Sequence, residues 1–438
     1  MHPNRLQVGI DFSQKRADFC LLFPDGQPLL SHQAFANSHP GYQKARQMLL
    51  DTLRQYAFDG LDVSGEATSY YWLPFFWHLA HDAELTARDL SLFLLNPRQV
   101  HWFKKSLPPD DKADNTDPFY IAERTRTRRP GATWQPQDDW LPLRFYTRLR
   151  FHLVQNLTRE KNYYLIPLFL LHSTYQGIRP FSNPFGVTSQ HVLGDLTQSD
   201  GPSLAELAKL PLEELAEQLE KWSSGTLEDP LETARKLQQV AAESFPLDEP
   251  LLTPVLRILD HTQEHITFLQ QQIQQVEQWI EAEVQAHHPQ ALFLDTVPGV
   301  GLVLAAGFVA EIGDLERFFQ TPKWDKKRKR YHTRTLREVE DAVAKLAGLW
   351  WPKVASGDFV AEDRHLAKTG NRYLRYYLIQ AANGMHRHIP AYARFFNRKF
   401  REVTRHKHKR ALVLTARKSI GLFVGLLHRK EAYRSEEG

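Results

Sequence analysis

The sequence contains a single cysteine, Cys20, among its 438 residues. One cysteine cannot form an internal disulfide, and there is no cysteine cluster to hold zinc or an iron–sulfur centre. No run approaches the roughly 20 apolar residues that a membrane-spanning helix needs, and the first residues lack the apolar core of a signal peptide. The 22 glycines and 26 prolines are near average usage, which excludes collagen-like and low-complexity chains. We therefore expect a soluble, intracellular protein of two or three domains without a membrane partner.

The net charge of +4 conceals an uneven distribution along the chain. Residues 317–438 carry roughly 29 Lys and Arg against roughly 11 Asp and Glu, a local charge of about +18. The preceding residues carry about −14. Such an asymmetry indicates a polyanionic partner for the C-terminal third, and a nucleic acid is the most common polyanion. The alternative is a solvated basic face.

The first part of the chain has the pattern of an α/β domain. The runs that predict strands are 6–11, 17–23, 28–35, 61–66 and 91–96, with helical spacing at 41–57 and again before 91. Three strands followed by helix, strand, helix and strand is the order expected of a ribonuclease-H-like domain, although other α/β domains also fit this order. We assign this domain to residues 1–135.

The middle of the chain, residues 136–290, reads as helical. Apolar residues recur at a 3–4 spacing between Leu251 and Val284, which predicts a long amphipathic helix in a coiled coil. We interpret this region as a structural or dimerisation arm. The remaining residues, 291–438, predict a basic helical domain.

A glycine-rich turn opens the basic domain. Gly299 and Gly301 precede an apolar helix over 302–312. Glycines before a helix N-terminus let backbone amides approach a phosphate, as in helix–hairpin–helix DNA-binding elements. An ordinary glycine-rich helix cap is the alternative.

Four carboxylates occupy positions that suit metal chemistry. Asp11 and Glu66 end predicted strands, and Asp114 and Asp117 have an i, i+3 spacing that puts both on one helix face. Oxygen ligands of this kind suit one or two Mg²⁺ ions, which support phosphodiester chemistry. Each acid alone is more often a cap or a solvated residue, so the prediction depends on the set.

These acids lie in motifs that resemble a known family. The segments 9–15, 65–70, 96–100 and 112–117 resemble the DEDD motifs of RuvC-like insertion-sequence transposases, which are related to Piv-type DNA invertases. The segments 296–301, 311–314, 348–352, 356–357 and 368–375 resemble the C-terminal transposase domain of that family. The motifs follow one another in the same order as in the family.

The resemblance implies an RNA-guided DNA recombinase. By position, Asp11, Glu66, Asp114 and Asp117 hold Mg²⁺, and Ser356 attacks the scissile phosphate to form a transient phosphoserine link to DNA. A structured bridge RNA pairs with the element ends and the target DNA, and the protein acts as a dimer or tetramer. The implied location is the prokaryotic cytoplasm, in association with the nucleoid.

Several polar and basic residues are candidates for nucleic-acid contact. Near the predicted nucleophile and the glycine-rich turn, the candidates for phosphate or DNA contact are Gly299, Gly301, Lys368, Asn371, Arg372 and Arg375. A second set, flanked by Trp324 and Tyr331, comprises Lys326, Lys327, Arg328, Lys329 and Arg330. A third set near helical spacing comprises Arg144, Arg148 and Arg150, for which an exposed face is the alternative.

Two other functions compete with this interpretation. The first is a RuvC-like junction-resolving nuclease that uses only the carboxylates and water. The second is a catalytically inactive scaffold that binds nucleic acid with a steep salt dependence.

Overall fold

The computed structural model describes most of the chain, in two compact units. The described residues are 4–106, 117–127, 133–136, 140–186, 188–192, 204–207, 209–325, 328–352, 355–356, 359–360, 366–367 and 369–435. The first unit comprises Met1–Asp138 with Glu316–Arg334, and the second comprises Asp139–Leu315 with Thr335–Gly438. Each unit is described by itself.

The first unit contains a five-stranded sheet of strand order β3-β2-β1-β4-β5. The strands are β1 (Arg5–Phe12), β2 (Arg16–Leu22), β3 (Pro28–Ala36), β4 (Gly60–Glu66) and β5 (Leu90–Leu95). The first three strands form an antiparallel meander, and β4 and β5 continue the sheet parallel to β1. This mixed order is the one predicted for a ribonuclease-H-like domain, and the prediction is confirmed.

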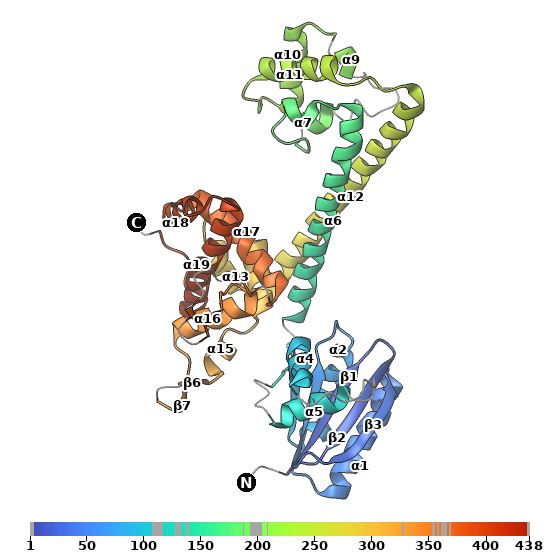
Figure 1. Cartoon of the computed structure of the whole chain (residues 1–438), viewed down its shortest axis with the longest axis vertical. Coiled ribbons are helices and arrows are strands. Elements are labelled where there is room, and N and C mark those ends of the chain that lie inside the picture. The colour runs from blue at the N-terminus through green and yellow to red at the C-terminus, as the bar shows by residue number, and fades with distance from the viewer. Residues whose placement is uncertain are drawn as a thin grey trace. The chain divides into compact units, whose positions relative to one another are not determined.

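Helices cover both faces of this sheet (Figure 1). They are α1 (His39–Tyr56), α2 (Leu73–Ala80), α3 (Ala83–Thr86), α4 (Pro97–Lys105) and α5 (Asp117–Thr127). Side chains of α1 and α2 form the main apolar core with one face of the sheet. On the other face, Ala122 of α5 packs against Cys20 and Leu22. Burial raises the pKa of the Cys20 thiol to about 12, so this cysteine is a core residue.

The second unit begins with a long pair of helices. Helix α6 (Leu141–Leu171) runs alongside α12 (Glu249–His287), and Figure 1 shows the two side by side. The buried residues of α12 follow the predicted 3–4 spacing, including Leu259, Ile266 and Ile273. The amphipathic helix predicted from the sequence is therefore present, and α6 of the same chain covers part of its apolar stripe. Dimerisation through this arm stays a prediction.

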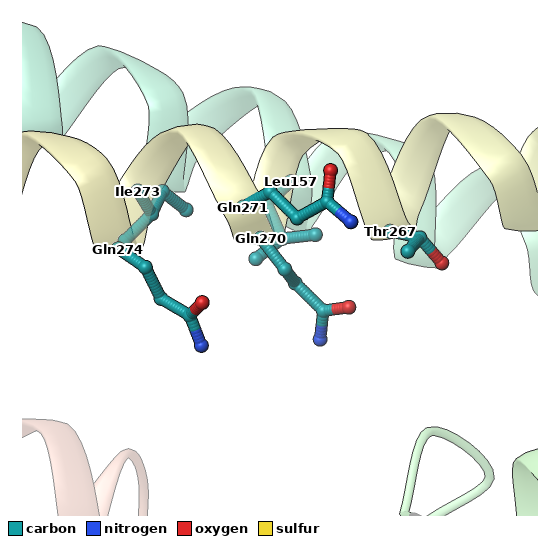
Figure 2. Close-up of a pocket in the computed structure, with 6 residues that line it drawn as sticks. All are labelled: Leu157, Thr267, Gln270, Gln271, Ile273 and Gln274. Atoms are coloured by element: carbon teal, nitrogen blue, oxygen red, sulfur yellow. The ribbon is translucent and has the colours of Figure 1, made fainter.

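A small helical module connects the ends of these two helices. Its helices are α7 (Tyr175–Ile178), α9 (Leu204–Leu207), α10 (Leu212–Ser223) and α11 (Pro230–Glu243). They share one apolar core with α6 and α12, in which Tyr164, Leu219 and Leu259 are buried. Along the arm lies an open concavity of about 440 Å³. Figure 2 shows the side chains that line it, of which the polar ones are amide and hydroxyl groups of α12, such as Gln270 and Gln274.

The remaining helices form the C-terminal part of the second unit. They are α13 (Ala291–Asp295), α14 (Gly301–Ile312), α16 (Leu336–Ala347), α17 (Arg372–His388), α18 (Pro390–Arg401) and α19 (Lys407–Arg429). Two-residue strands β8 (Ala355–Ser356) and β9 (Phe359–Val360) pair between α16 and α17. Among the described helices, α19 alone passes a length and hydropathy test for a membrane span, and it packs against α16, α17 and α18 with half of its apolar window buried.

The segment assigned to the first unit between α14 and α16 is short. It contains α15 (Glu316–Gln320) and the antiparallel pair β6 (Lys323–Asp325) and β7 (Arg330–His332). The combination of an α/β sheet with helical regions confirms the fold class predicted from the sequence. The three functional domains, with boundaries after residues 135 and 290, stay a prediction, since compactness alone divides the chain in two.

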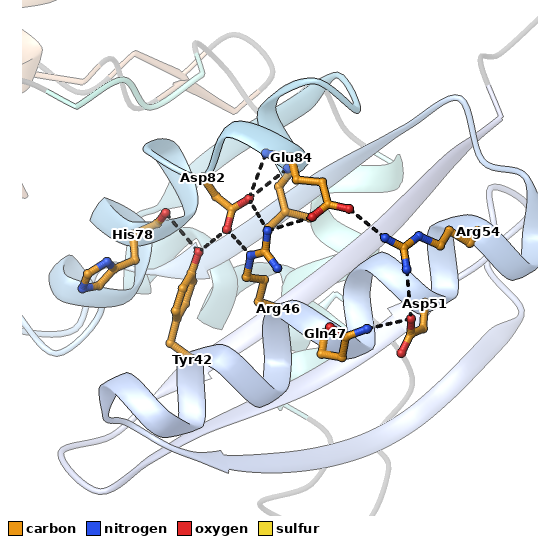
Figure 3. A network of polar contacts seen from close by, with 9 residues as sticks. Tyr42, Arg46, Gln47, Asp51, Arg54, His78, Asp82 and Glu84 are labelled. Atoms are coloured by element: carbon orange, nitrogen blue, oxygen red, sulfur yellow. Dashed lines mark hydrogen bonds and ion pairs between the residues drawn. The ribbon is translucent and has the colours of Figure 1, made fainter.

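A polar network joins α1 to the start of α3 (Figure 3). The Asp82 carboxylate accepts hydrogen bonds from the Tyr42 hydroxyl at 2.8 Å, from the Arg46 guanidinium, and from the amides of Glu84 and Leu85 at 3.1 and 3.0 Å. Arg46 also donates to the Glu84 carboxylate at 2.9 Å. Burial alone would raise the pKa of Asp82, but these hydrogen bonds outweigh it and lower the pKa.

We expect Asp82→Asn to destabilise the first unit by about 1–3 kcal/mol at pH 7, because a charged hydrogen-bond acceptor of Arg46 is lost. The contribution of Asp82 is fully present above its unfolded pKa of about 4 and is lost as the pH falls through its lower folded value. Urea unfolding followed by circular dichroism should therefore show the gap to wild type narrowing below about pH 4. Asp51→Asn, on the exposed side of α1, is the control. An equal loss at acid and neutral pH would contradict the role given to the Asp82 charge.

Candidate active site

Asp11 and Glu66 are neighbours at the carboxyl ends of two parallel strands. The register of β1 and β4 pairs Ile10 with Gly65, so the next residue of each strand is one of these acids. The alternation of side chains along a strand puts Asp11 on the same face of the sheet as Gly9. Ligand sites of open α/β sheets commonly lie at this edge. The two strand-end acids predicted to act together are thus adjacent.

A missing side chain brings α5 onto the same face. A Cβ atom on Gly9 would lie 2.0 Å from the carbonyl oxygen of Pro118, so only glycine lets the backbone of α5 approach this closely. Asp117, the first residue of α5, immediately precedes that proline. Farther along α5, a buried 2.5 Å hydrogen bond from the Ser64 hydroxyl to the Thr125 hydroxyl holds the helix on β4. Asp117 is therefore positioned by backbone packing as well as by its own contacts.

The three described acids influence one another electrostatically. Burial is the main cause that raises the pKa of Glu66, a hydrogen bond from the Thr68 hydroxyl at 3.1 Å lowers it, and the charges of Asp11 and Asp117 raise it further. The net result is a raised pKa. Like charges held close together disfavour ionisation of one another. A cation bound at this edge would relieve that repulsion.

These acids are of the chemical kind that a magnesium ion takes as ligands. Mg²⁺ takes oxygen ligands, retains several waters and needs only one or two carboxylates from the protein. In the part of the chain that the structure describes, no group of three or more His, Cys, Asp or Glu is arranged to hold a metal ion. The fourth predicted acid, Asp114, lies outside the described residues. The described acids therefore supply fitting donors without forming a complete ligand set.

Lys104 is a residue of this edge that sequence reasoning missed. Its ammonium group, in the last turn of α4, forms an ion pair with Asp117 and lies 5.3 Å from the centroid of the Tyr120 ring. A lysine of the protein thus neutralises part of the negative charge at the edge. The signal in the sequence was a lysine at the end of a helix that begins directly after β5, at Asn96–Pro97.

The predicted nucleophile, Ser356, is described only through its backbone. It is the last residue of β8 and pairs with Phe359 of β9. Ser356 belongs to the second unit, whereas the carboxylates belong to the first. Its role as nucleophile stays a prediction.

The arginines at helical spacing on α6 have partners inside the second unit. Glu311 of α14, only 3% exposed, accepts hydrogen bonds from Arg148 Nε and Nη2 at 2.7 and 2.8 Å. Arg144 Nε donates to the carbonyl oxygen of Ala310 at 2.9 Å. Arg150 pairs with Glu277 of α12 at 2.6 Å. These three residues join helices of the unit, and their predicted contact with nucleic acid is without support from this geometry.

Two of the residues near α17 that were predicted to contact phosphate or DNA also have partners inside the second unit. Asn371 caps α17 by accepting hydrogen bonds from the amides of Tyr373 and Leu374 at 2.9 and 3.1 Å, and its own amide donates to Glu311 at 2.6 Å. Arg375 Nη1 donates to the carbonyl oxygen of Ala347 at 3.0 Å, and burial lowers its pKa. The exposed Arg372 lies over the Tyr373 ring, 4.8 Å from its centroid. Arg372 is the member of this described set with an exposed charge, and Lys368 lies outside the described residues.

The two glycines of the turn before α14 differ in their surroundings. Both have a positive φ, 82° at Gly299 and 67° at Gly301. A Cβ on Gly299 would meet the backbone of Gly384 in α17 at 2.5 Å, so this glycine permits close packing of α17 on the turn. A Cβ on Gly301 would meet nothing within 4 Å. Phosphate contact by either glycine stays a prediction.

The β6–β7 pair carries part of the predicted aromatic and basic cluster. Trp324 and Tyr331 are 45% and 44% exposed, and their ring centroids are 4.9 Å apart. Arg328 lies 3.8 Å from the Asp325 carboxylate, and Lys329 and Arg330 are exposed. Lys326 and Lys327 lie outside the described residues. Exposed rings beside cations are the features that single-stranded nucleic acids bind, so this hairpin remains a candidate contact.

Comparison with protein families identifies the first part of the chain. Residues 8–168 match the sequence model of IS110-type DEDD transposases, described as a transposase. This segment, which is less than half of the chain, is similar to that family. The matched segment contains Asp11, Glu66 and Asp117 and most of α6, and it ends before the region of Ser356. No curated protein matches the chain.

We expect Gly9→Ala to destabilise the protein by about 1–3 kcal/mol or more, because the added methyl group overlaps the backbone of α5. Thermal unfolding followed by circular dichroism measures the loss. The matched control is Gly177→Ala, where an added Cβ meets nothing within 4 Å. Equal melting temperatures of Gly9→Ala and wild type would show that α5 does not rest on β1 as described.

We expect Glu311→Ala to cost about 3–5 kcal/mol, because it leaves Arg148 without its partner in a largely buried site. Urea unfolding monitored by circular dichroism gives the change in free energy of unfolding. Glu232→Ala, which removes an exposed ion pair with Lys236, is the control and should change stability by less than about 1 kcal/mol. A Glu311→Ala variant as stable as this control would contradict the buried ion pair.

Proposed function

We propose that this protein is a transposase of the DEDD type, a DNA recombinase that cuts and exchanges strands of a mobile element under the guidance of a structured RNA. The observation that carries the proposal is the carboxylate edge, where Asp11 and Glu66 are adjacent and Asp117 lies within electrostatic reach. This edge falls within the segment that matches the transposase family. Asp114, also within that segment, is the proposed fourth acid.

The proposed reaction begins with attack by the Ser356 hydroxyl oxygen on the scissile phosphorus. The Oγ–P bond forms as the bond from phosphorus to the leaving sugar oxygen breaks, and that oxygen takes up a proton. A second sugar hydroxyl then attacks the phosphoserine and regenerates the serine, so the number of phosphodiester bonds is unchanged. Mg²⁺ at the carboxylates, when bound, would stabilise the charge that develops on the phosphate oxygens.

The protein's own groups have separate tasks in this proposal. The acids would hold the metal ion, and the ammonium group of Lys104 offsets part of the negative charge of Asp117. A serine hydroxyl is a weak nucleophile near neutral pH, so cations beside the phosphate must offset the charge of the transition state. Arg372, exposed at the start of α17, is the described candidate for that task.

The proposed partners are DNA, at the element ends and the target, and a bridge RNA. The charge of about +18 over residues 317–438 supports a polyanionic partner. Exchange of two strands requires more than one active site, which favours a dimer or tetramer as the active form. The proposed location is the prokaryotic cytoplasm, in association with the nucleoid.

We expect Ser356→Ala to abolish covalent capture of DNA while binding of the guide RNA persists, since only the nucleophile is removed. Denaturing gels of labelled element-end DNA detect the protein–DNA adduct, and gel shifts measure RNA affinity. Ser182→Ala, an exposed serine of the arm module, is the control.

We expect Asp11→Asn to block strand exchange with little loss of RNA affinity.

Other outcomes identify the competing functions. An adduct that persists in Ser356→Ala would exclude this serine as nucleophile. Cleaved DNA with free ends and no religation, unaffected by Ser356→Ala, would favour a RuvC-like nuclease. Binding without any processing of either strand by wild type would favour an inactive scaffold.

A further inference from the structure

A cavity of about 380 Å³ lies between α18, α19 and the chain that follows α19. Its walls are the first residues of α18, the second half of α19, and residues 431–435, which we call the C-terminal strap. Pockets for small molecules typically measure about 300–1,000 Å³, so this one accepts a group of the size of a nucleotide but no duplex.

The strap is held in place by hydrogen bonds at two points. The Glu431 amide donates to the carbonyl oxygen of Leu426 at 3.2 Å, where α19 ends. The Tyr433 amide donates to the Thr296 hydroxyl at 2.8 Å. Thr296 itself donates to Phe293 of α13 at 2.7 Å and precedes the glycine-rich turn. The strap wall of the cavity is therefore fixed to the core of the unit.

The lining of the cavity is cationic. The lining includes one carboxylate, that of Glu431, and four basic side chains, those of Arg394, Lys418, Arg429 and Arg434. That carboxylate already pairs with Arg429 at 3.2 Å. No ion pair is found for Arg394 or Arg434 within the described part of the chain, whereas Arg429 of the same cavity has one. Cations gathered at a cavity without matching acids raise the local concentration of anions.

Two tyrosines give the same cavity an aromatic wall. Lys418 Nζ lies 4.7 Å from the centroid of the Tyr392 ring, which is buried at the start of α18. Burial and the nearby Tyr433 both raise the pKa of Tyr392, which indicates that the two phenol groups are close. Tyr433 is half-buried on the strap. Apolar side chains of Leu422 and Leu426 complete the lining.

We propose that this cavity binds one nucleotide unit of a single-stranded nucleic acid, with its phosphate at Arg394 and Arg434 and its base against Tyr433. The cationic lining and the aromatic wall together indicate a nucleotide. A phosphate alone needs no aromatic wall, and an uncharged aromatic ligand needs no arginines. Base–aromatic stacking combined with phosphate neutralisation is the general mode of single-strand recognition. The inference rests on the proposed function only for the identity of the partner as a nucleic acid.

The test compares single strands with duplexes on the full chain. Fluorescence anisotropy measures the affinity for a labelled 12-nucleotide DNA, the RNA of the same sequence, and the 12-base-pair DNA duplex. The double variant Arg394→Ser, Arg434→Ser should weaken single-strand binding about tenfold and reduce its salt slope by about 1–2, since up to two phosphate contacts are lost. Tyr433→Ala should weaken it at least about fivefold through lost stacking, and Tyr433→Phe should retain affinity.

The control removes the same charge elsewhere. Arg235→Ser, Lys221→Ser takes two cations from α11 and α10, outside the cavity, and should leave all affinities unchanged. An unchanged ratio of single-strand to duplex affinity in the arginine double variant overturns the proposal. The proposal is also overturned if the arginine double variant loses binding of the free nucleotide AMP while its affinities for the strands are unchanged, because the cavity then binds a free nucleotide.

The outcome is separable from that of the proposed function. If the wild-type protein exchanges no strands but the ratio of single-strand to duplex affinity falls in the cavity variants, the proposed nucleotide site is supported and the proposed recombinase function is contradicted. Strand exchange that depends on Ser356, combined with an unchanged ratio, contradicts the cavity alone.

Discussion

Where α5 crosses β1, its backbone rests directly on Gly9, and the position of Asp117 follows from that contact. Any side chain at residue 9 would displace the helix, and with it the acid at its first residue. The same strand carries Asp11 two residues later, and its parallel neighbour ends in Glu66. A backbone contact therefore brings together acids from three elements whose like charges oppose that arrangement. Burial first, and the charges of Asp11 and Asp117 in addition, raise the pKa of Glu66 at this edge.

In the second unit a buried carboxylate has the corresponding organising role. Glu311 receives donors from Arg148 of α6 and from Asn371, which also caps α17. The carboxylate of Glu311, in α14, thus links this helix to α6 and to the start of α17. A buried ion pair contributes less to stability than its Coulomb energy suggests, but it disfavours every packing that leaves the charge unpaired. The network therefore selects one arrangement of α6, α14 and α17 among those that apolar packing alone would permit.

The sequence predicted the sheet and the acids because both depend on local pattern. Strand order, the position of Asp11 next to the last residue of β1 and the end of β4 at Glu66 all follow from apolar runs and their limits. The partners of Arg148 and Arg150 could not be predicted, because they depend on which face of α6 packs against Glu311 and Glu277, more than a hundred residues away. Lys104 was missed for the same reason: its role depends on the approach of α4 to α5. Asn371 resembles a phosphate ligand in sequence, whereas its position before a helix makes it a cap.

These pairings change how the basic charge of the chain should be interpreted. A cation that neutralises a buried carboxylate is unavailable to a phosphate, and only contacts that displace counterions contribute to the salt dependence of nucleic-acid binding. Arg148 and Arg150 therefore add to the net charge without adding to that slope. Among the described residues, exposed cations accompany aromatic rings on the β6–β7 hairpin and around the cavity beneath the C-terminal strap. In both places rings accompany the charge, and rings stack on bases that a duplex keeps inside its own stack. With the nucleic-acid partner proposed above, these two places would suit unpaired strands better than an intact duplex.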